Sequence, residues 1–314
     1  MSYVFGPVPS RRLGKSLGID PVPLKTCNWN CVYCQLGRTR PLTNQRREYI
    51  PCQDLLAEIG QVLSDHQPGE IDWVTFVGSG EPTLHSSLGW LIRRVKQICS
   101  LPVAVITNGS TLYLPEIRLA LSDADAVLPS LDAGNPRLYR KVNRPWPELT
   151  FNRLLEGLIA FRQEYTGKLW LEMMLVQGLN DTEEALTEIA PAICRIQPDR
   201  VHINLPVRPL AEAWVCLPGE SSLQRAQAIL GTIADIVLPA LSQPVTCYPA
   251  DLESTILGII TRHPMQETEL CSMVGRWTPV DVHEALDALR TSQKVCLIER
   301  YGKQFWSAAS ASYA

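Results

Sequence analysis

Three cysteines near the start of the chain have the type and spacing that metal chemistry needs. They stand in the segment Cys27-Asn-Trp-Asn-Cys31-Val-Tyr-Cys34. A closed [4Fe-4S] cluster takes one thiolate for each iron, so three thiolates leave one iron open to a small molecule. The flat ring of Tyr33 directly precedes the last cysteine and is suited to pack beside a bound purine. The segment therefore predicts a cluster held by Cys27, Cys31 and Cys34, with chemistry at the open iron.

A structural zinc site is the alternative for these cysteines. Such a site needs four ligands, usually two Cys-x-x-Cys pairs or a cysteine pair with a histidine pair. No second cysteine pair and no His-x(3-5)-His segment is present. The other seven cysteines stand far apart, at positions 52, 99, 194, 216, 247, 271 and 296. The spacing favours the iron cluster, and a second cluster built from Cys194, Cys216 and Cys247 is less expected than ordinary buried thiols.

The composition limits the setting of this chemistry. The chain has 314 residues and a net charge of −3, which suits one large α/β domain with a small appendage. Its first residues form neither a signal peptide nor a transit sequence, and no apolar run approaches a membrane span. We therefore expect a cytoplasmic protein with reduced thiols and no membrane contact. The net charge supplies no general attraction to nucleic acid.

Short β-branched runs alternate with longer amphipathic stretches up to about residue 245. This alternation is typical of βα units around a parallel sheet. The expected strands are residues 16–20, 73–77, 103–107, 126–131, 169–176 and 201–205, and the expected helices are residues 52–64, 88–99, 115–122, 151–165 and 182–196. Six units are too few for a closed eight-stranded barrel. We therefore expect an α/β fold, a partial (β/α)6 TIM-type barrel of parallel strands, over residues 1–248.

Polar segments follow the first four expected strands, where parallel barrels place their reactive loops. After the cysteine segment come Gly78-Ser-Gly80-Glu81-Pro, then Asn108, then Ser130 with Asp132. The glycines would let the backbone pass close to a ligand, and Glu81 can accept hydrogen bonds from an ammonium group. Asn108 has a tight turn as its alternative role, and Ser130 and Asp132 have a helix N-cap. We expect these residues to bind the cofactor.

The last two expected strands carry polar residues on one face. Alternation places Glu172 with Trp170 and Met174, and His202 with Asn204. We expect this face to line the cofactor and substrate cavity, with Glu172 and His202 as candidate catalytic residues and Asn204 as a cofactor contact. A satisfied core pair without chemistry is the alternative for Glu172 and His202.

A buried Glu172 needs a partner, because an unpaired buried carboxylate shifts its pKa. Arg144, Arg208 and the substrate itself are the candidates. Several basic residues also stand near strand ends, among them Arg11 and Arg12. Together they favour an anionic substrate at the rim of the barrel.

The sequence pattern changes after residue 250. Residues 252–263, 265–275 and 278–292 are expected as helices and residues 295–306 as a hairpin around Gly302, which is a winged-helix outline. Thr278 is the expected N-cap of the third helix, with Asp281 placed for a capping box. Residues 251–314 hold six Lys and Arg against eight Asp and Glu, which does not suit a surface that neutralises phosphates. We expect a winged-helix-like domain over residues 249–314 that covers the barrel, holds a partner or dimerises, rather than one that binds DNA.

Two of these segments resemble a known family. The spacing of Cys27, Cys31 and Cys34 is similar to the cluster motif of the radical S-adenosylmethionine (radical SAM) superfamily, and the glycine segment resembles its GGE-type motif, with Ser79 in place of the middle glycine. The resemblance implies a partial barrel, a [4Fe-4S] cluster whose open iron chelates S-adenosylmethionine (SAM), and an electron donor such as flavodoxin or ferredoxin. It also implies that the glycine segment holds the amino group of SAM and that SAM is split to a 5′-deoxyadenosyl radical.

Over its first part the chain resembles the branch of this superfamily related to the wybutosine-synthesis tRNA enzymes. The resemblance rests on Gly6-Pro-Val-Pro-Ser-Arg-Arg-Leu-Gly14, Pro23-Leu-Lys-Thr-Cys-Asn28, Ser130-Leu-Asp-Ala-Gly134 and Asn143-Arg-Pro145. A small molecule, an RNA or a protein is therefore expected as substrate. A radical activase for a protein partner and a wyosine-like RNA-modifying enzyme are alternatives. An iron-sulfur redox-sensing regulator is a further one, but it predicts a basic third helix, which is absent.

Overall fold

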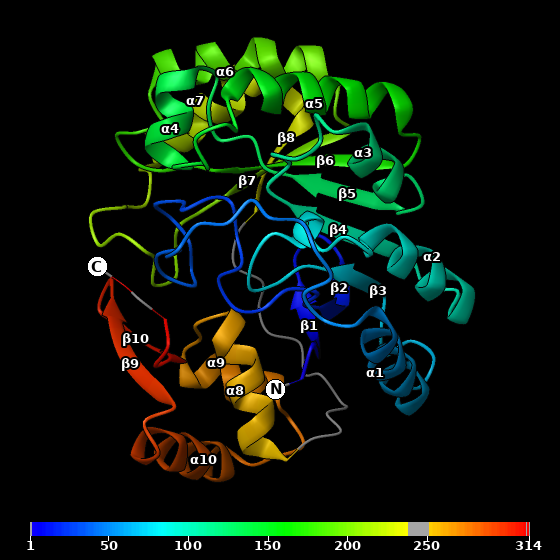
Figure 1. Ribbon diagram of the computed structural model, residues 1–314. Helices are drawn as coiled ribbons and strands as arrows, with labels where there is room; N and C mark the ends of the chain where they lie inside the picture. The colour runs from blue at the N-terminus through cyan, green and yellow to red at the C-terminus, as the bar shows by residue number, and fades with distance from the viewer. Residues whose placement is uncertain (1, 238–250, 312, 314) are drawn as a thin grey trace.

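One curled sheet of eight strands forms the main body of the computed structural model, which describes residues 2–237, 251–311 and 313 (Figure 1). The strands lie in sequence order: β1 (Val4–Ser10), β2 (Gly14–Ile19), β3 (Trp73–Phe76), β4 (Val103–Thr107), β5 (Ala126–Pro129), β6 (Lys168–Met174), β7 (Arg200–Asn204) and β8 (Ala234–Val237). β1 runs antiparallel to β2, and every later neighbour pair is parallel. The sheet is a half-barrel, which agrees with the predicted partial TIM-type barrel.

All six predicted strands are present, but the prediction of six was too low because β1 and β8 were missed. β1 contains Pro7 and Pro9, which cannot donate to a ladder and therefore make the segment look unlike a strand. An edge position tolerates both prolines, because one side of the strand has no neighbour in the sheet. β8 has only four residues and directly follows a single 3-10 turn, so it carries little periodic signal.

Seven α-helices connect the strands and wrap round the outside of the sheet (Figure 1). They are α1 (Cys52–Asp65), α2 (Leu88–Ile98), α3 (Pro115–Leu121), α4 (Pro136–Val142), α5 (Phe151–Glu164), α6 (Glu183–Ile196) and α7 (Glu220–Leu230), with 3-10 turns η1 (Pro82–Leu84) and η2 (Gly231–Ile233). Their apolar faces and the outer face of the sheet share one large core, which includes Leu17, Val74 and Leu171. Strand alternation turns the other face inward, where Leu13 packs with Leu128.

Residues 251–311, here called the C-terminal unit, pack around a separate hydrophobic core. The unit contains α8 (Leu252–Arg262), α9 (Glu267–Met273), α10 (Pro279–Thr291) and a hairpin of β9 (Val295–Arg300) and β10 (Lys303–Ala308). The predicted order of three helices and a hairpin is confirmed, and so is the capping box of Thr278 with Asp281. The predicted domain boundary at residues 248–249 lies outside the described residues. Among those residues, no helix is both long and apolar enough for a membrane span.

The C-terminal unit packs against β1, on the side of the sheet away from helices α2 to α7 (Figure 1). Arginine side chains form much of this contact. Arg262 of α8 donates to the backbone oxygen of Ser2 at 3.0 Å. Arg300 of β9 donates to the backbone oxygen of Val215 at 2.6 Å. Charge-assisted bonds of this kind hold their groups in a definite orientation, so the unit has one fixed position on the sheet.

Candidate functional site

The three cysteines of the predicted cluster lie together on the loop between β2 and α1. Cys27, Cys31 and Cys34 are free and partly buried, and the charge of each thiolate would act on the others. Burial raises the pKa of Cys27 to about 12, and the nearby Glu81 carboxylate adds to this. Burial and Asp132 raise the pKa of Cys31 well above its usual value. Such thiols become thiolates only when a cation compensates their charge, which is what bound iron does.

Four N–H groups point at the sulfur atoms of these cysteines. The Trp29 amide donates to Cys27 Sγ at 3.4 Å, and Asn108 Nδ2 donates to the same sulfur at 3.8 Å. Asn143 Nδ2 donates to Cys31 Sγ at 3.8 Å, and Lys25 Nζ donates to Cys34 Sγ at 3.3 Å. N–H donors around cysteine sulfur stabilise thiolates and tune cluster potentials. The donor set therefore fits an iron-sulfur cluster.

The same loop does not gather its ligands around one point. Within residues 2–237, 251–311 and 313, no group of three or more His, Cys, Asp or Glu side chains is placed to hold a single metal ion. A structural zinc ion requires such convergence, because all four donors bind one atom. The cysteines of a [4Fe-4S] cluster bind different iron atoms and need not converge. Cys194 is exposed on α6, and Cys247, the third member of the second set considered, lies outside the described residues.

Tyr33 is held by Asp132, which follows β5. Tyr33 Oη donates to Asp132 Oδ2 at 2.5 Å, and Asn143 Nδ2 donates to the same oxygen at 2.6 Å. The Met174 amide donates to Asp132 Oδ1 at 2.8 Å. Asp132 therefore joins the cysteine loop to the end of β6, and its burial raises its pKa to about 6. It is not a helix cap, since Asn135 caps α4; contact with a ribose stays a prediction.

The glycines of the Gly78–Glu81 loop are required by contacts within the protein. Gly78 has φ +144°, and a Cβ atom there would lie 2.4 Å from Asp20 Oδ1. A Cβ atom on Gly80 would lie 2.0 Å from the backbone oxygen of Thr26, which precedes Cys27. The loop therefore packs directly against the approach to the cysteine loop. Ligand contact by its backbone stays a prediction.

Glu81 is buried and uses its carboxylate within the protein. Its Oε1 accepts bonds from the amide and hydroxyl of Thr83 at 3.0 and 2.7 Å and from Thr107 Oγ1 at 2.6 Å. Its Oε2 accepts a bond from the Asn108 amide at 2.6 Å. An ionised carboxylate has about two acceptor sites on each oxygen, so these bonds fully occupy Oε1 and leave one site on Oε2. Glu81 thus positions Asn108, whose side-chain amide donates to Asn28 Oδ1 and Cys27 Sγ; a direct bond to SAM stays a prediction.

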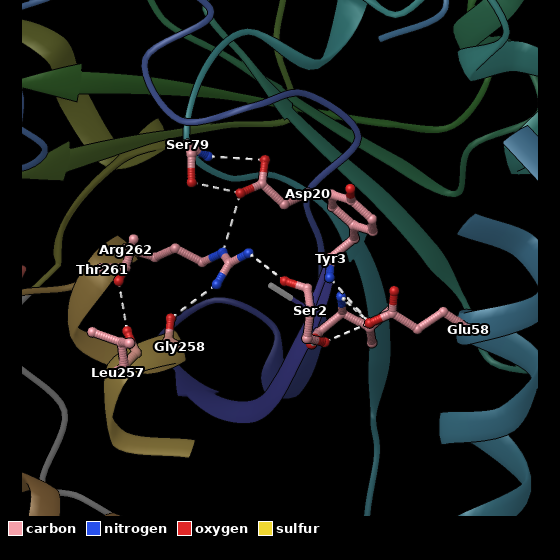
Figure 2. A network of polar contacts seen from close by, with 10 residues as sticks. Ser2, Tyr3, Asp20, Glu58, Ser79, Leu257, Gly258, Thr261 and Arg262 are labelled. Atoms are coloured by element: carbon pink, nitrogen blue, oxygen red, sulfur yellow. Dashed lines mark hydrogen bonds and ion pairs between the residues drawn. The ribbon is translucent and has the colours of Figure 1, made fainter. Parts of the chain in front are cut away.

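The network in Figure 2 explains the serine in the middle of the glycine loop. Ser79 donates from its amide to Asp20 Oδ1 at 3.1 Å and from its hydroxyl to Asp20 Oδ2 at 2.5 Å. Arg262 Nε of the C-terminal unit donates to the same Oδ2 at 3.1 Å. Burial raises the pKa of Asp20, while Arg262 and the Ser79 bonds oppose this. The only sequence signal for this network was the serine itself.

Glu172 forms an ion pair with a residue that the sequence did not indicate. Arg12, in the turn between β1 and β2, lies 2.9 Å from Glu172 Oε1 and donates to Asn204 Oδ1 at 3.0 Å. Of the three predicted candidates, Arg144 and Arg208 were wrong, and contact with the substrate stays a prediction. Arg144 pairs with Glu212, and Arg208 pairs with Glu269. The turn could not be placed because β1 was not predicted as a strand.

His202 and Ser130 lie close to Glu172 in the sheet. His202 is opposite Glu172 in register on β7, and Ser130 forms an isolated parallel bridge with Glu172. The His202 ring packs edge-on against Trp170 with centroids 5.6 Å apart, and none of the described residues forms a hydrogen bond with its Nδ1. Burial and the positive charge of Arg12 lower the pKa of His202 to about 4. The residue is therefore a neutral buried histidine at neutral pH, and it is not in the lining of the cavity described next.

A cavity of about 290 Å³ lies inside the curl of the sheet. Glu172, Met174 and Asn204 line it, as predicted for the inward face of the last strands. Residues of β2, β3 and β4, the β1–β2 turn and α9 complete the wall. Gln35, next to Cys34, and Val77, next to Gly78, also line it. The cavity therefore adjoins both the cysteine loop and the glycine loop.

Comparison with known proteins agrees with this geometry. The model of the radical SAM superfamily matches residues 22–190, which is more than half of the chain. The chain therefore belongs to the radical SAM superfamily, whose enzymes use a [4Fe-4S] cluster and SAM. The residues present fit the cluster, as the cysteine loop and its N–H donors indicate. Such enzymes also need an electron donor and a substrate.

Individual proteins resemble the chain over different shares of their length. The UPF0026 protein MJ1312 of Methanocaldococcus jannaschii is 33% identical over 280 residues, which are 88% of this chain and 87% of that protein. A GTPase Obg of Brachyspira hyodysenteriae is 38% identical over 264 residues, but the chain covers only 38% of its length. A solved structure described as native anSMEcpe with bound AdoMet has a TM-score of 0.50 at 16% identity, over 68% of this chain and 58% of that one. This last likeness concerns the fold alone.

Proposed function

We propose that the protein is a radical SAM enzyme that abstracts hydrogen from a small molecule held inside the half-barrel. The observation that carries this proposal is the position of the cavity, which adjoins the cysteine loop at Gln35 and the glycine loop at Val77. A [4Fe-4S] cluster held by the cysteine loop would, together with bound SAM, supply the chemistry: one-electron reduction of SAM to methionine and a 5′-deoxyadenosyl radical able to take a hydrogen atom from the substrate. Flavodoxin or ferredoxin is the proposed source of the electron.

The residues around the cluster loop give it a fixed shape. Cys27, Cys31 and Cys34 would hold the cluster. Asn108 and Asn143 donate N–H groups to two of the three sulfur atoms. Such donors hold the cysteine side chains in one geometry before the cluster binds. The cofactor supplies the reaction chemistry, and the protein orients and tunes it.

The residues of the cavity would hold the substrate. Glu172 and Asn204 face the cavity and are oriented by Arg12. Glu172 stays our candidate for a proton-transfer role, because its pKa is raised by burial. His202 is the weaker candidate, since it does not line the cavity.

The C-terminal unit is proposed as a separate winged-helix-like domain over residues 249–314, with the barrel over residues 1–248. Its helix order and hairpin support this assignment. Its role is to cover the barrel, since His263, Met265 and Glu269 form part of the cavity wall. Helix α10, the DNA-contacting helix of many winged-helix proteins, carries Asp281, Glu284 and Asp287 and does not suit phosphate binding.

The size of the cavity favours a small substrate over the other classes considered. A volume of about 290 Å³ suits a small molecule. An activase for a protein partner and a wyosine-like RNA-modifying enzyme stay predictions, as does membership in the wybutosine branch. No specific surface of the described residues supports them.

One experiment tests the proposal. The protein is reconstituted anaerobically with iron and sulfide, reduced with dithionite and incubated with SAM, and 5′-deoxyadenosine and methionine are quantified. We expect both products from the wild type and neither from Cys31→Ala. Cys194→Ala is the matched control, because this exposed thiol on α6 should leave product and iron content unchanged. Wild-type protein that binds zinc instead of iron, or equal product from Cys31→Ala, would contradict the proposal.

A further inference from the structure

The positive and negative charges of the side chains that line the cavity are unequal in number. Three arginines line it, Arg11, Arg12 and Arg208, against two carboxylates, Glu172 and Glu269. Arg12 is paired with Glu172, and Arg208 lies 3.3 Å from Glu269. Each of these pairs is close to neutral. The cavity therefore keeps one positive charge in excess, that of Arg11.

Arg11 forms no ion pair in the part of the chain that the structure describes, although the charge of Glu269 acts on it. Its Nη1 donates to the backbone oxygen of Val237, at the end of β8, at 2.7 Å. Burial, with Arg208 and Arg12 nearby, lowers the pKa of Arg11 to about 10, and the carboxylate of Glu269 only partly opposes this. The guanidinium stays charged at neutral pH, and a bound anion would relieve this repulsion.

The wall near Arg208 includes a neutral histidine. His263, directly after α8, lines the cavity, and the described residues supply no hydrogen bond to its ring nitrogens. Burial and the positive charges of Arg208 and Arg262 lower the pKa of His263 to about 3. The ring therefore adds a donor or acceptor to the cavity without adding charge.

The rest of the wall is largely apolar. Val77, Ile106 and Met174 line the barrel side, and Met265 and Met273 line the side of the C-terminal unit. Methionine side chains adapt to irregular shapes, so this part of the wall suits a variable apolar body. A cavity with an apolar body and one charged end selects a ligand of the same pattern.

We propose that this cavity binds a small organic anion, a carboxylate or a phosphate monoester with an apolar body, and that Arg11 holds its charged end. The proposal deepens the proposed function, on which it rests, by naming the substrate class of the same site. Arg11 is a binding residue here and takes no part in hydrogen abstraction. Glu172 and Asn204, on the opposite strands, would face the remainder of the ligand.

Three probes of equal chain length test the proposal: hexanoate, hexyl phosphate and the neutral hexanamide. Binding to the reconstituted holoprotein is measured by saturation-transfer NMR and calorimetry, with and without saturating SAM. We expect one or both anions to bind and hexanamide to bind at least 10-fold more weakly. Preference between the two anions distinguishes a carboxylate from a phosphate substrate. Binding that is equal for the anions and the amide overturns the proposal, and so does loss of the anion when SAM is added.

Variants separate a binding role of Arg11 from a structural one. Arg11→Gln should weaken anion binding at least 10-fold, Arg11→Lys should keep most of it, and Arg94→Gln on the exposed face of α2 should change nothing. Glu269→Gln should strengthen anion binding, because it frees Arg208, while glutamine still serves the capping box of α9. An unchanged affinity in Arg11→Gln, with the thermal midpoint of the wild type, overturns the assignment.

The two proposals can fail separately. Anion binding without production of 5′-deoxyadenosine would contradict the proposed function alone. Production of 5′-deoxyadenosine by a protein that does not distinguish anions from the amide would contradict the substrate class alone.

Discussion

Arg262 Nε lies 3.1 Å from Asp20 Oδ2, and the two side chains are only 5% and 4% exposed. This ion pair joins residues 242 positions apart, one at the end of α8 and the other directly after β2. Asp20 in turn accepts both bonds from Ser79 (Figure 2). The C-terminal unit thus reaches the loop that resembles the SAM-binding motif through two side chains.

The first prediction concerns this ion pair. Arg262→Gln leaves Asp20 buried without a cation, which typically costs about 3–5 kcal/mol. We expect that loss in denaturant unfolding, together with weaker SAM binding, because Asp20, the anchor of Ser79, is no longer held by Arg262. Arg290→Gln on the exposed face of α10 is the control and should change neither. The double variant Asp20→Asn with Arg262→Gln tests the coupling. If its loss of unfolding free energy equals the sum of the losses in the two single variants, the two residues are not coupled.

The second prediction concerns Gly80. In Gly80→Ala the new Cβ would lie 2.0 Å from the backbone oxygen of Thr26, and backbone cannot move aside cheaply. We expect a displaced cysteine loop, seen as low iron content after reconstitution and a reduced thermal midpoint. Gly258→Ala is the matched comparison, because nothing lies within 4 Å of its added Cβ in α8. That variant should gain about 0.5–1 kcal/mol, as alanine does over glycine inside helices. Normal iron content in Gly80→Ala would refute the argument.

The third prediction concerns the donors to cysteine sulfur. Asn143→Ala removes the N–H donor to Cys31 Sγ and a bond to the buried Asp132. We expect a lower reduction potential of the reconstituted cluster, because N–H donors stabilise the more negative reduced state. A stability loss of about 1–3 kcal/mol should accompany it, since Asp132 loses a partner. Electron paramagnetic resonance during a redox titration measures the potential. Asn44→Ala, whose side-chain oxygen accepts from Asn28, is the control and should leave the potential unchanged.

The fourth prediction concerns pH. The pKa of His202 is lowered to about 4 in the folded protein, against about 6.5 in an unfolded chain. Between these values the unfolded state binds more protons, so stability should fall as the pH falls from 6.5 towards 4. The shift corresponds to about 3 kcal/mol at most. His202→Gln should therefore lose less stability than the wild type between pH 7 and pH 5 in denaturant unfolding.

A second histidine should affect the pH dependence of stability in the opposite direction. The exposed His283 has its pKa raised by the hydrogen bond that its ring donates to the carboxylate of Glu267. Its contribution is present at low pH and is lost as the pH rises through the folded pKa. His283→Gln should therefore not reduce the acid sensitivity. A His202→Gln variant with the wild-type pH profile would show that the buried ring does not set it.

The strands and helices of the barrel could be predicted because they are periodic over many residues. β1 could not, because its prolines hide the alternation and only its edge position makes them acceptable. The β1–β2 turn was therefore unplaced, and with it Arg12 as the partner of Glu172. A local pattern carries no information on a contact that only the whole fold creates.

The cysteine loop was predictable for a different reason. Its ligands lie within eight residues, so their spacing alone suggests the chemistry. The roles of Glu81 and Asp132 were harder to predict, since a carboxylate after a strand can bind a ligand or hold another loop. In the structure Glu81 binds Thr107 and the Asn108 amide, and Asp132 binds Tyr33 and Asn143.

The shared wall of the cavity has a consequence for the order of biosynthesis. Residues 8–18 supply one part of this wall, and residues 263–273 supply another. A growing chain therefore completes the barrel strands on the ribosome well before the segment that closes the cavity has been translated. The complete cavity wall and the ion pair of Asp20 can therefore form only after α8 and α9 have emerged.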